Sequence, residues 1–465
     1  MIAFPQMQYR ETLAYLYSLT NYERVPLSTQ AYETIKIDRM HYLLDALGNP
    51  HKQYHIIHVA GTKGKGSTCA MLASCLQRIA PKVGLYTSPH LSSFRERIQI
   101  NCEPISKEEV CELAAEVRSV AQRLPDITTF EATTAMAFLH FARREVDWAV
   151  VEVGLGGRLD ATNVVLPKVS VITSISFDHQ HILGSTLHDI ALEKAGIIKP
   201  GVPVVSQAQL PEAMAAIEQV ARDQQASLTV IGRHWRWFPG SVSLIKQSFE
   251  VKKVAQVRTE AHPFLNDLEG WYEIPCLGRH QVENATTAIA VLDILRKDIY
   301  EMYGRQLALR LVRDGLWAVR WPGRFEILRP EPPVVLDGAH NLDSARKLVA
   351  TLVEVFGSRR WTFVFGTLRD KDAAGMIAEL SPRAGRWIMS QLANNPRAIP
   401  AHELLQLAQS RGVPAESVPD LEEAMRLALN SSSPVCVFGS VAFVGEARLH
   451  WAKHTGAPLP LTDEL

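Results

Sequence analysis

The sequence predicts an α/β fold with two mainly parallel sheets, because strand-like apolar runs alternate with helical patterns along most of its 465 residues. A glycine-rich loop follows the first clear strand and opens a helix. A Pro-Gly pair at 322–323 interrupts the alternation before it restarts. These observations predict an N-terminal domain at 1–318, a linker at 319–325 and a smaller, Rossmann-like C-terminal domain at 326–465.

The elements follow in order from the first strand, expected at 55–61. The glycine-rich loop occupies 61–67, a helix runs to about residue 79, and further strands are expected at 83–87, 148–153, 169–175 and 202–205. The stretch at 230–275 contains aromatic residues and short apolar pieces, which predict a small antiparallel appendage. In the C-terminal domain, strands are expected at 333–337, 361–366 and 435–439, and helices at 344–356 and 403–409.

The composition is typical of a globular protein, with 47% hydrophobic and 21% charged residues, and excludes disordered, collagen-like and coiled-coil chains. Forty-nine Lys and Arg balance 49 Asp and Glu, so no bulk charge attracts nucleic acid or an anionic membrane. No 18-residue apolar run occurs, and residues 1–5 lack the basic start of a signal peptide. Six cysteines without a C-x-x-C pair indicate buried thiols in a reducing compartment. We expect a cytoplasmic monomer with small-molecule partners and without nucleic-acid or membrane partners.

The loop Gly61-Thr-Lys-Gly-Lys-Gly-Ser67 is typical of a phosphate-binding site. Its glycines let backbone N–H groups surround a phosphate, and the following helix adds partial positive charge at its N-terminus. Lys65 would supply a full charge to the β- and γ-phosphate oxygens. The loop departs from the strict Walker pattern, because Gly66 separates Lys65 from Ser67. An ordinary turn rarely combines two lysines with three glycines, so the sequence predicts a P-loop ATPase domain.

Two further candidate residues lie near the ends of predicted strands. Glu152 belongs to an apolar strand, where a carboxylate is costly unless it is paired or binds a metal. Ligands gather at the carboxyl ends of parallel strands, which favours Mg²⁺ binding by Glu152 over a place on a polar edge. His179 follows the strand at 169–175, and its position alone supports a ligand role and a structural role equally.

Lys194 is predicted on the apolar face of a helix, because Leu187, Ile190, Ala191 and Lys194 follow the i, i+3, i+4, i+7 pattern. Burial disfavours the ammonium form and lowers the pKa of a lysine. A neutral amine can act as a base or nucleophile, or react with CO₂ to form a carbamate. A lysine whose head extends past this face into solvent fits the same pattern.

Together these motifs resemble those of folylpolyglutamate synthases and bifunctional dihydrofolate synthases, a branch of the ATP-dependent Mur ligase superfamily. The matching segments keep the family order through nearly the whole chain and lie at 58–67, 87–90, 152–163, 177–179, 193–197, 322–325 and 336–341. Two positions depart from the family pattern. Lys63 stands where many bacterial members have Asn, and residues 337–342 read Asp-Gly-Ala-His-Asn-Leu instead of Asp-Val-Ala-His-Asn-Pro.

The resemblance implies a nucleotide and metal site. ATP would be bound by Thr62, Lys63, Gly64, Lys65, Gly66, Ser67, Asn284, Arg324 and Asp337. Two Mg²⁺ ions would be held by Ser88, Glu152 and His179, and a carboxylated Lys194 (N6-carboxylysine) would help to hold the second ion. P-loop logic alone would select Ser67 as the metal hydroxyl, and we follow the family pattern in choosing Ser88. Lys65, Lys194 and His179 are then the expected catalytic residues.

The resemblance also implies the substrate sites. The pterin pocket would comprise Thr128, Thr129, Phe130, Glu131, Leu159, Asp160 and Ala161. The sequence around Asp160 resembles that of the bifunctional enzymes more than that of the enzymes that only elongate the glutamate tail. We expect Asp160 to position dihydropteroate. His340 and Ser440 are candidates for contacting the incoming glutamate.

The implied activity is an ATP-dependent amide ligase that adds L-glutamate to dihydropteroate, to the glutamate tail of folates, or to both, through an acyl phosphate. Three alternatives stay open at this point. Another Mur-type ligase would take a cell-wall or polymer substrate. A P-loop kinase would release ADP without an amine cosubstrate, and a nucleotide-binding switch would need neither Glu152 nor Lys194.

Overall fold

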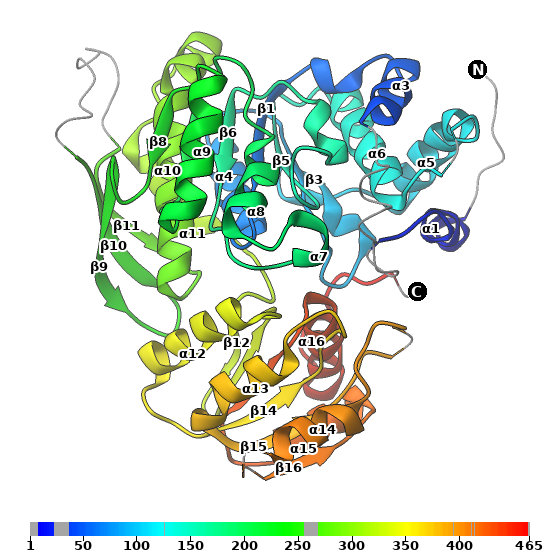
Figure 1. Cartoon of the computed structure of the whole chain (residues 1–465), viewed down its shortest axis with the longest axis vertical. Helices are drawn as coiled ribbons and strands as arrows, with labels where there is room; N and C mark the ends of the chain where they lie inside the picture. The colour runs from blue at the N-terminus through cyan, green and yellow to red at the C-terminus, as the bar shows by residue number, and fades with distance from the viewer. Residues whose placement is uncertain are drawn as a thin grey trace.

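The computed structural model describes residues 8–22, 37–124, 126–254, 268–393, 395–410, 412 and 414–463 (Figure 1). Its largest sheet has the strand order β4-β3-β2-β5-β1-β6-β7-β8. The strands are β1 (His55–Ala60), β2 (Val83–Tyr86), β3 (Ile98–Ile100), β4 (Glu103–Pro104), β5 (Trp148–Glu152), β6 (Val169–Ile172), β7 (Val204–Ser206) and β8 (Leu228–Val230). Neighbours from β2 to β8 are parallel, and β3 and β4 add an antiparallel edge.

Successive side chains of a strand point to opposite faces of the sheet. Because those of the central strands are buried on both faces, helices cover both faces of this sheet. Ile57 and Val59 enter a core shared with α4 (Lys65–Leu76), α10 (Arg279–Tyr303) and α11 (Leu309–Ala318). Ile56 enters a second core, which it shares with α1 (Tyr9–Ser18), α3 (Asp38–Ala46), α5 (Lys107–Ala121) and α6 (Thr129–Arg143). Ala60 joins a smaller core with α8 (Leu187–Ala195) and α9 (Pro211–Asp223). The short elements are α7 (Gln180–Leu183) and the 3₁₀ turns η1 (Pro50–Lys52), η2 (Phe94–Arg97) and η3 (Ala161–Val164).

A three-stranded antiparallel sheet follows and confirms the predicted appendage. Its order is β11-β10-β9, with β9 (Trp235–Val242), β10 (Gln247–Lys253) and β11 (Gly270–Ile274). Phe249, Val251 and Tyr272 are buried and extend the core shared by α4, α10 and α11. Residues 255–267 of the predicted appendage lie outside the described residues.

The C-terminal sheet has the order β12-β13-β17-β14-β15-β16 and is parallel except between β12 and β13. Its strands are β12 (Glu326–Pro330), β13 (Pro333–Asp337), β14 (Trp361–Phe365), β15 (Ala384–Met389), β16 (Ala415–Ser417) and β17 (Val435–Phe438). One face packs on α12 (Leu342–Phe356), α13 (Ala373–Leu380) and α14 (Ala401–Gln409), beside the turn η5 (Ser381–Arg383). The other packs on α15 (Leu421–Leu429) and α16 (Val441–Thr455). The predicted α/β class, with a smaller Rossmann-like C-terminal unit, is confirmed.

Several boundaries differ from the predicted ones for local reasons. The strand expected at 169–175 ends at Ile172, because the segment beyond it turns to accept hydrogen bonds at Ser174 O from the N–H groups of Thr62 (2.8 Å) and Lys63 (3.1 Å). The helix expected to reach residue 79 ends at Leu76. The helix expected from 344 begins at Leu342, because the side chain of Asn341 caps it.

The expectation of six buried thiols is wrong at one position. Five cysteines are buried, but Cys102 is exposed, since it lies in the turn between β3 and β4 at the edge of the large sheet. Within the described ranges, none of the helices has the length and apolar character that crossing a membrane requires.

The end of the described chain packs back onto the N-terminal part (Figure 1). The carboxylate of Asp463 accepts hydrogen bonds from Tyr9 Oη (2.6 Å), Ser93 Oγ (2.6 Å) and Phe94 N (2.7 Å). Helix α16 also packs against the loop before η2, since a Cβ at Gly445 would clash with the carbonyl oxygen of Leu91. The two sheets are therefore connected by the chain end as well as by the segment at 319–325.

Candidate active site between the two parallel sheets

A cavity of about 610 Å³ lies between the eight-stranded and six-stranded sheets. Its walls come from segments that follow β1, β2, β5 and β6 on one side and β13 and β17 on the other. The carboxyl ends of parallel strands, where α/β proteins bind ligands, thus face one space. All the residues that the sequence predicts for the site line this cavity.

The glycine-rich loop forms one wall and begins helix α4. Gly64 has φ +90°, a left-handed conformation that favours glycine, and a Cβ there would also clash with Asn284 Oδ1. Gly66 is constrained by packing, because a Cβ there would lie 3.0 Å from Trp321 Cζ2 and 3.3 Å from Glu152 Oε2. The sequence of the loop therefore allows its backbone to approach both the linker and the buried carboxylate.

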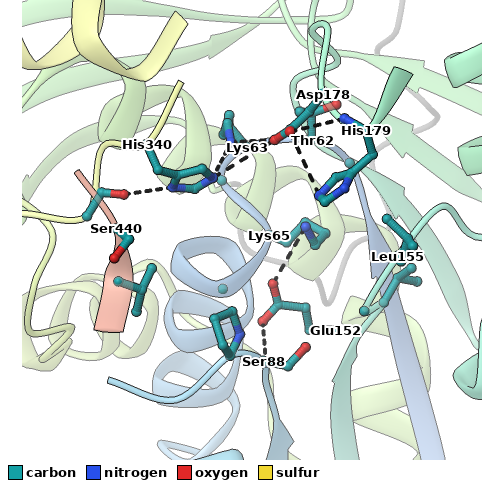
Figure 2. Close-up of a pocket in the computed structure, with 18 of the residues that line it drawn as sticks. Thr62, Lys63, Lys65, Ser88, Glu152, Leu155, Asp178, His179, His340 and Ser440 are labelled. Atoms are coloured by element: carbon teal, nitrogen blue, oxygen red, sulfur yellow. Dashed lines mark hydrogen bonds and ion pairs between the residues drawn. The ribbon is translucent and has the colours of Figure 1, made fainter. Parts of the chain in front are cut away.

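Glu152 is the buried anion of this wall, with 4% of its surface exposed. Oε2 accepts a hydrogen bond from Ser88 N at 3.1 Å, and Oε1 lies 3.9 Å from Lys65 Nζ (Figure 2). Burial raises the pKa of this carboxyl, and the nearby ammonium of Lys65 opposes that shift. The ammonium of Lys65 at 3.9 Å, one N–H and the more distant guanidinium of Arg324 balance the carboxylate charge only in part, which fits a cation-binding position.

The donor types near Glu152 suit Mg²⁺ better than a soft metal. Mg²⁺ is commonly held by one or two carboxylates with water and phosphate oxygens, and Ser88 and Glu152 supply oxygen donors beside each other. In the part of the chain that the structure describes, no group of three or more His, Cys, Asp or Glu is arranged to hold a metal. Ser67, the hydroxyl favoured by P-loop logic, instead accepts a hydrogen bond from Gln281 Nε2 at 3.4 Å.

Lys194 is buried in α8, with 4% exposure, and does not extend into solvent. Burial lowers its pKa to about 7, and the neighbouring charge of Lys65 acts in the same direction. A large fraction of neutral amine is therefore available near neutral pH. His179, which precedes α7 in a left-handed conformation with φ 51°, has a pKa lowered by burial to about 4. Its imidazole is neutral at pH 7 and has a lone pair for a ligand.

Asp178 connects the two sides of the cavity and was missed by the sequence analysis as a site residue. Its Oδ2 accepts from Lys63 Nζ at 2.9 Å, and its Oδ1 accepts from Lys371 Nζ at 2.8 Å. His340 Nε2 lies 2.6 Å from Lys63 Nζ and 3.9 Å from Asp178 Oδ2 (Figure 2). The two lysines hold the pKa of Asp178 well below its usual range. The loop position that departs from the family pattern, Lys63, thus reaches across to the C-terminal sheet.

The C-terminal wall is made rigid by backbone hydrogen bonds. Asp337 accepts hydrogen bonds from Phe325 N and Ala339 N, both at 2.8 Å. Burial raises the pKa of Asp337, and the nearby charge of Arg324 opposes that shift. Ser440 Oγ caps α16 by accepting from Phe443 N at 3.1 Å. These contacts fix a carboxylate and a hydroxyl on the side that faces the glycine-rich loop.

The predicted pterin pocket is held by helix capping and one ion pair. Thr128 caps α6, and its N–H and hydroxyl both donate to Glu131 Oε2 at 2.8 Å. Arg39 donates to Oε1 and Oε2 of Glu131 at 2.7 and 2.9 Å, so this carboxylate is occupied by protein donors. Thr129 Oγ1 donates to Leu16 O at 2.8 Å. Three of the predicted pocket residues therefore shape the pocket wall through contacts within the chain.

Two family models match successive parts of the chain. The Mur ligase middle domain matches residues 59–292, and the Mur ligase glutamate ligase domain matches residues 323–441. The dihydrofolate synthase/folylpolyglutamate synthase of Bacillus subtilis (strain 168) is 35% identical over 419 residues, covering 89% of this chain and 94% of that protein.

Two solved structures share the fold over nearly their whole length. Mycobacterium tuberculosis folylpolyglutamate synthase, solved with ADP and AMPPCP, has a TM-score of 0.80 and 32% identity, covering 92% of this chain and 96% of that one. Escherichia coli FolC, solved with DHPP and ADP, has a TM-score of 0.78 and 30% identity, covering 95% and 98%.

The fold, the cavity and these matches define a Mur ligase, an ATP-dependent class of enzyme. Within that class, the chain belongs to the dihydrofolate synthase/folylpolyglutamate synthase family. The comparisons support this ligase over the kinase and the nucleotide-binding switch.

Proposed function

We propose that this protein uses ATP to join L-glutamate to dihydropteroate, to the terminal glutamate of a folate, or to both. The observation that carries the proposal is the single cavity that combines the glycine-rich loop, the buried Glu152 and Lys194, and the C-terminal wall. The names of the relatives support the substrate class, and the FolC structure, solved with DHPP and ADP, supports a small-molecule ligand and a nucleotide in one protein.

The chemistry requires an activated carboxylate, because oxide is too poor a leaving group for direct amide formation. The substrate carboxylate attacks the γ-phosphoryl group of ATP, ADP leaves, and an acyl phosphate forms. The amino group of L-glutamate then attacks the acyl carbon and releases phosphate. In this proposal Lys65 neutralises charge on the transferred phosphoryl group, and the backbone of residues 62–67 holds the phosphates.

The roles of the other residues are part of the same proposal. Asn284, Arg324 and Asp337 complete the nucleotide site, Asp160 positions the pterin, and His340 and Ser440 contact glutamate. Ser88, Glu152 and His179 would hold Mg²⁺, which supplies charge neutralisation at the phosphates. The neutral amine of Lys194 would bind CO₂ as a carbamate and provide a further oxygen donor.

The proposed domains are 1–318 and 326–465, joined at 319–325. Their facing walls would exclude water from the acyl phosphate, which otherwise hydrolyses. We also propose a cytoplasmic location, which the cysteine pattern supports, and a monomer, which size-exclusion chromatography tests.

The test is an ADP-release assay with dihydropteroate and tetrahydrofolate supplied separately, each with and without L-glutamate. We expect ADP release that needs both a pterin acid and glutamate, with the new amide identified by mass spectrometry. Glu152→Gln should abolish that release, and Glu145→Gln, at an exposed residue after α6, is the control. Equal ATP consumption without an amino acid, or no response to pterin acids, would refute the proposal.

A further inference from the structure

Three buried polar side chains form a chain from the first strand to the predicted pterin pocket. His58, in β1, and Thr162, in η3, are completely buried, and Asp160 has 5% exposure. His58 Nε2 lies 2.8 Å from Thr162 Oγ1, and Thr162 Oγ1 donates to Asp160 Oδ1 at 2.5 Å. Only Asp160 of the three lines the cavity, so the other two can act on a ligand only through it.

The direction of each hydrogen bond in this chain follows from valence. Burial raises the pKa of Asp160, and the hydroxyl and N–H groups that donate to it oppose that shift. In its ionised form this carboxylate only accepts, so the single hydroxyl hydrogen of Thr162 is directed at Asp160. The oxygen of Thr162 is then an acceptor toward His58, which must carry its hydrogen on Nε2. The opposite nitrogen, Nδ1, is left without hydrogen, and it is buried with no hydrogen-bond partner among the described residues. The structure thus assigns one tautomer to this histidine.

The ring stays neutral because it is enclosed. Burial lowers the pKa of His58 to about 3, and the nearby charge of Lys199 acts in the same direction. Protonation would place a second N–H at Nδ1, where no acceptor is present within the described ranges. His58 therefore donates this hydrogen bond to Thr162 throughout the physiological pH range.

The carboxylate at the end of the chain is fixed by several donors. Oδ1 receives the N–H of Thr162 at 3.0 Å in addition to its hydroxyl, and Oδ2 receives the N–H of Leu155 at 2.9 Å. The hydroxyl of Thr162 is the one side-chain donor among these three, and the N–H of His58 holds the oxygen of that hydroxyl in place. Without the histidine, the buried oxygen of Thr162 would lose this donor and its contact with Asp160 would be less restrained.

We propose that His58 is a positioning residue which, through Thr162, holds Asp160 as an acceptor for the N–H groups of the pterin edge. This inference rests on the proposed function, since it assumes that Asp160 faces the pterin. The ligand chemistry follows from the same valence rule. A carboxylate whose orientation is fixed in this way selects a heterocycle that offers N–H donors and disfavours one that offers only acceptors.

The kinetic test uses two matched pairs of variants. Thr162→Val removes the hydroxyl at nearly constant shape, and Thr162→Ser keeps it. His58→Leu removes the donor, and His58→Gln places an amide N–H near the position of Nε2. We expect Thr162→Val and His58→Leu each to raise the KM for the pterin acid that the wild type uses about tenfold, while Thr162→Ser and His58→Gln recover most of the loss.

The two residues should also act as one unit. The double variant, His58→Leu with Thr162→Val, should be no worse than Thr162→Val alone, because the histidine acts only through that hydroxyl. The KM for ATP should stay within about twofold of the wild type in every variant. A purely structural role for β1 would instead raise the KM for ATP and pterin together, because the strand leads into the glycine-rich loop.

A spectroscopic test does not depend on activity. In protein labelled with ¹⁵N-histidine, long-range ¹H–¹⁵N correlations should show the hydrogen of His58 on Nε2, with the signal assigned by its loss in His58→Gln. A hydrogen on Nδ1, an unchanged pterin KM in Thr162→Val, or an equal rise in the KM for ATP would overturn the inference. Failure of the wild type to use any pterin acid would refute the proposed function instead, and the tautomer would still be measurable.

Discussion

Replacing Lys194 with methionine should stabilise the metal-free protein while it removes activity. Methionine keeps most of the buried aliphatic stem and removes the ammonium group. In the folded protein, burial lowers the pKa of Lys194 from 10.5 to about 7. The unfolded chain therefore binds this proton more tightly than the folded chain does, and between these two values the proton favours unfolding.

The size of the effect follows from those two pKa values. Each tenfold difference in proton affinity corresponds to about 1.4 kcal/mol. At pH 7 the unfolded state is fully protonated at this lysine and the folded state about half so, which costs the folded state about 4 kcal/mol. At pH 10.5 the cost falls below about 1 kcal/mol. The advantage of Lys194→Met should shrink accordingly as the pH rises.

Urea unfolding followed by tryptophan fluorescence, in CO₂-free buffer with EDTA at pH 7 and near pH 10, measures this difference. Lys297→Met is the matched control, since that lysine is 74% exposed, and it should change the unfolding free energy by less than about 0.5 kcal/mol. If Lys194→Met is no more stable than the wild type at pH 7, or if its advantage does not depend on pH, the ammonium is not held in a desolvated position.

Three further outcomes are expected. Lys194→Ala should lose activity, and bicarbonate should restore CO₂-stripped wild type but not the variant; retained activity in the variant would exclude the carbamate. Gly64→Ala should raise the KM for ATP at least tenfold, because its Cβ clashes with Asn284 and φ is +90°; an unchanged KM would show that the loop adapts. Asp463→Asn should lower the unfolding free energy by about 1–3 kcal/mol, because three hydrogen bonds lose their charged acceptor; thermal melting with unchanged Tm would contradict this.

Local patterns were sufficient to predict most of the fold. A strand buried on both faces has a short run of apolar side chains. Such runs located β1, β5 and β17 from the sequence. Helical spacing likewise predicted that Lys194 lies on the apolar face of a helix. Only the structure showed that its side chain is buried and does not extend into solvent. Boundaries shifted where a side chain or a loop from elsewhere intervened, as at Asn341.

Contacts between distant residues could not be predicted in this way. Asp178 binds Lys63, 115 residues away, and Lys371, 193 residues away, and no spacing rule connects such positions. The exposure of Cys102 was not predicted either. Composition indicates only that most cysteines are buried and does not show which one lies in a turn at the edge of a sheet.

The packing of Trp321 against Gly66 has a practical consequence for anyone handling this enzyme. Indole emission responds to nearby charge and water, and this ring lies within contact distance of the segment proposed to cradle phosphate. Titration with a non-hydrolysable nucleotide should therefore change intrinsic fluorescence. The chain has nine tryptophans, and subtracting the Trp321→Phe signal would isolate this one, giving a label-free optical reporter of nucleotide occupancy.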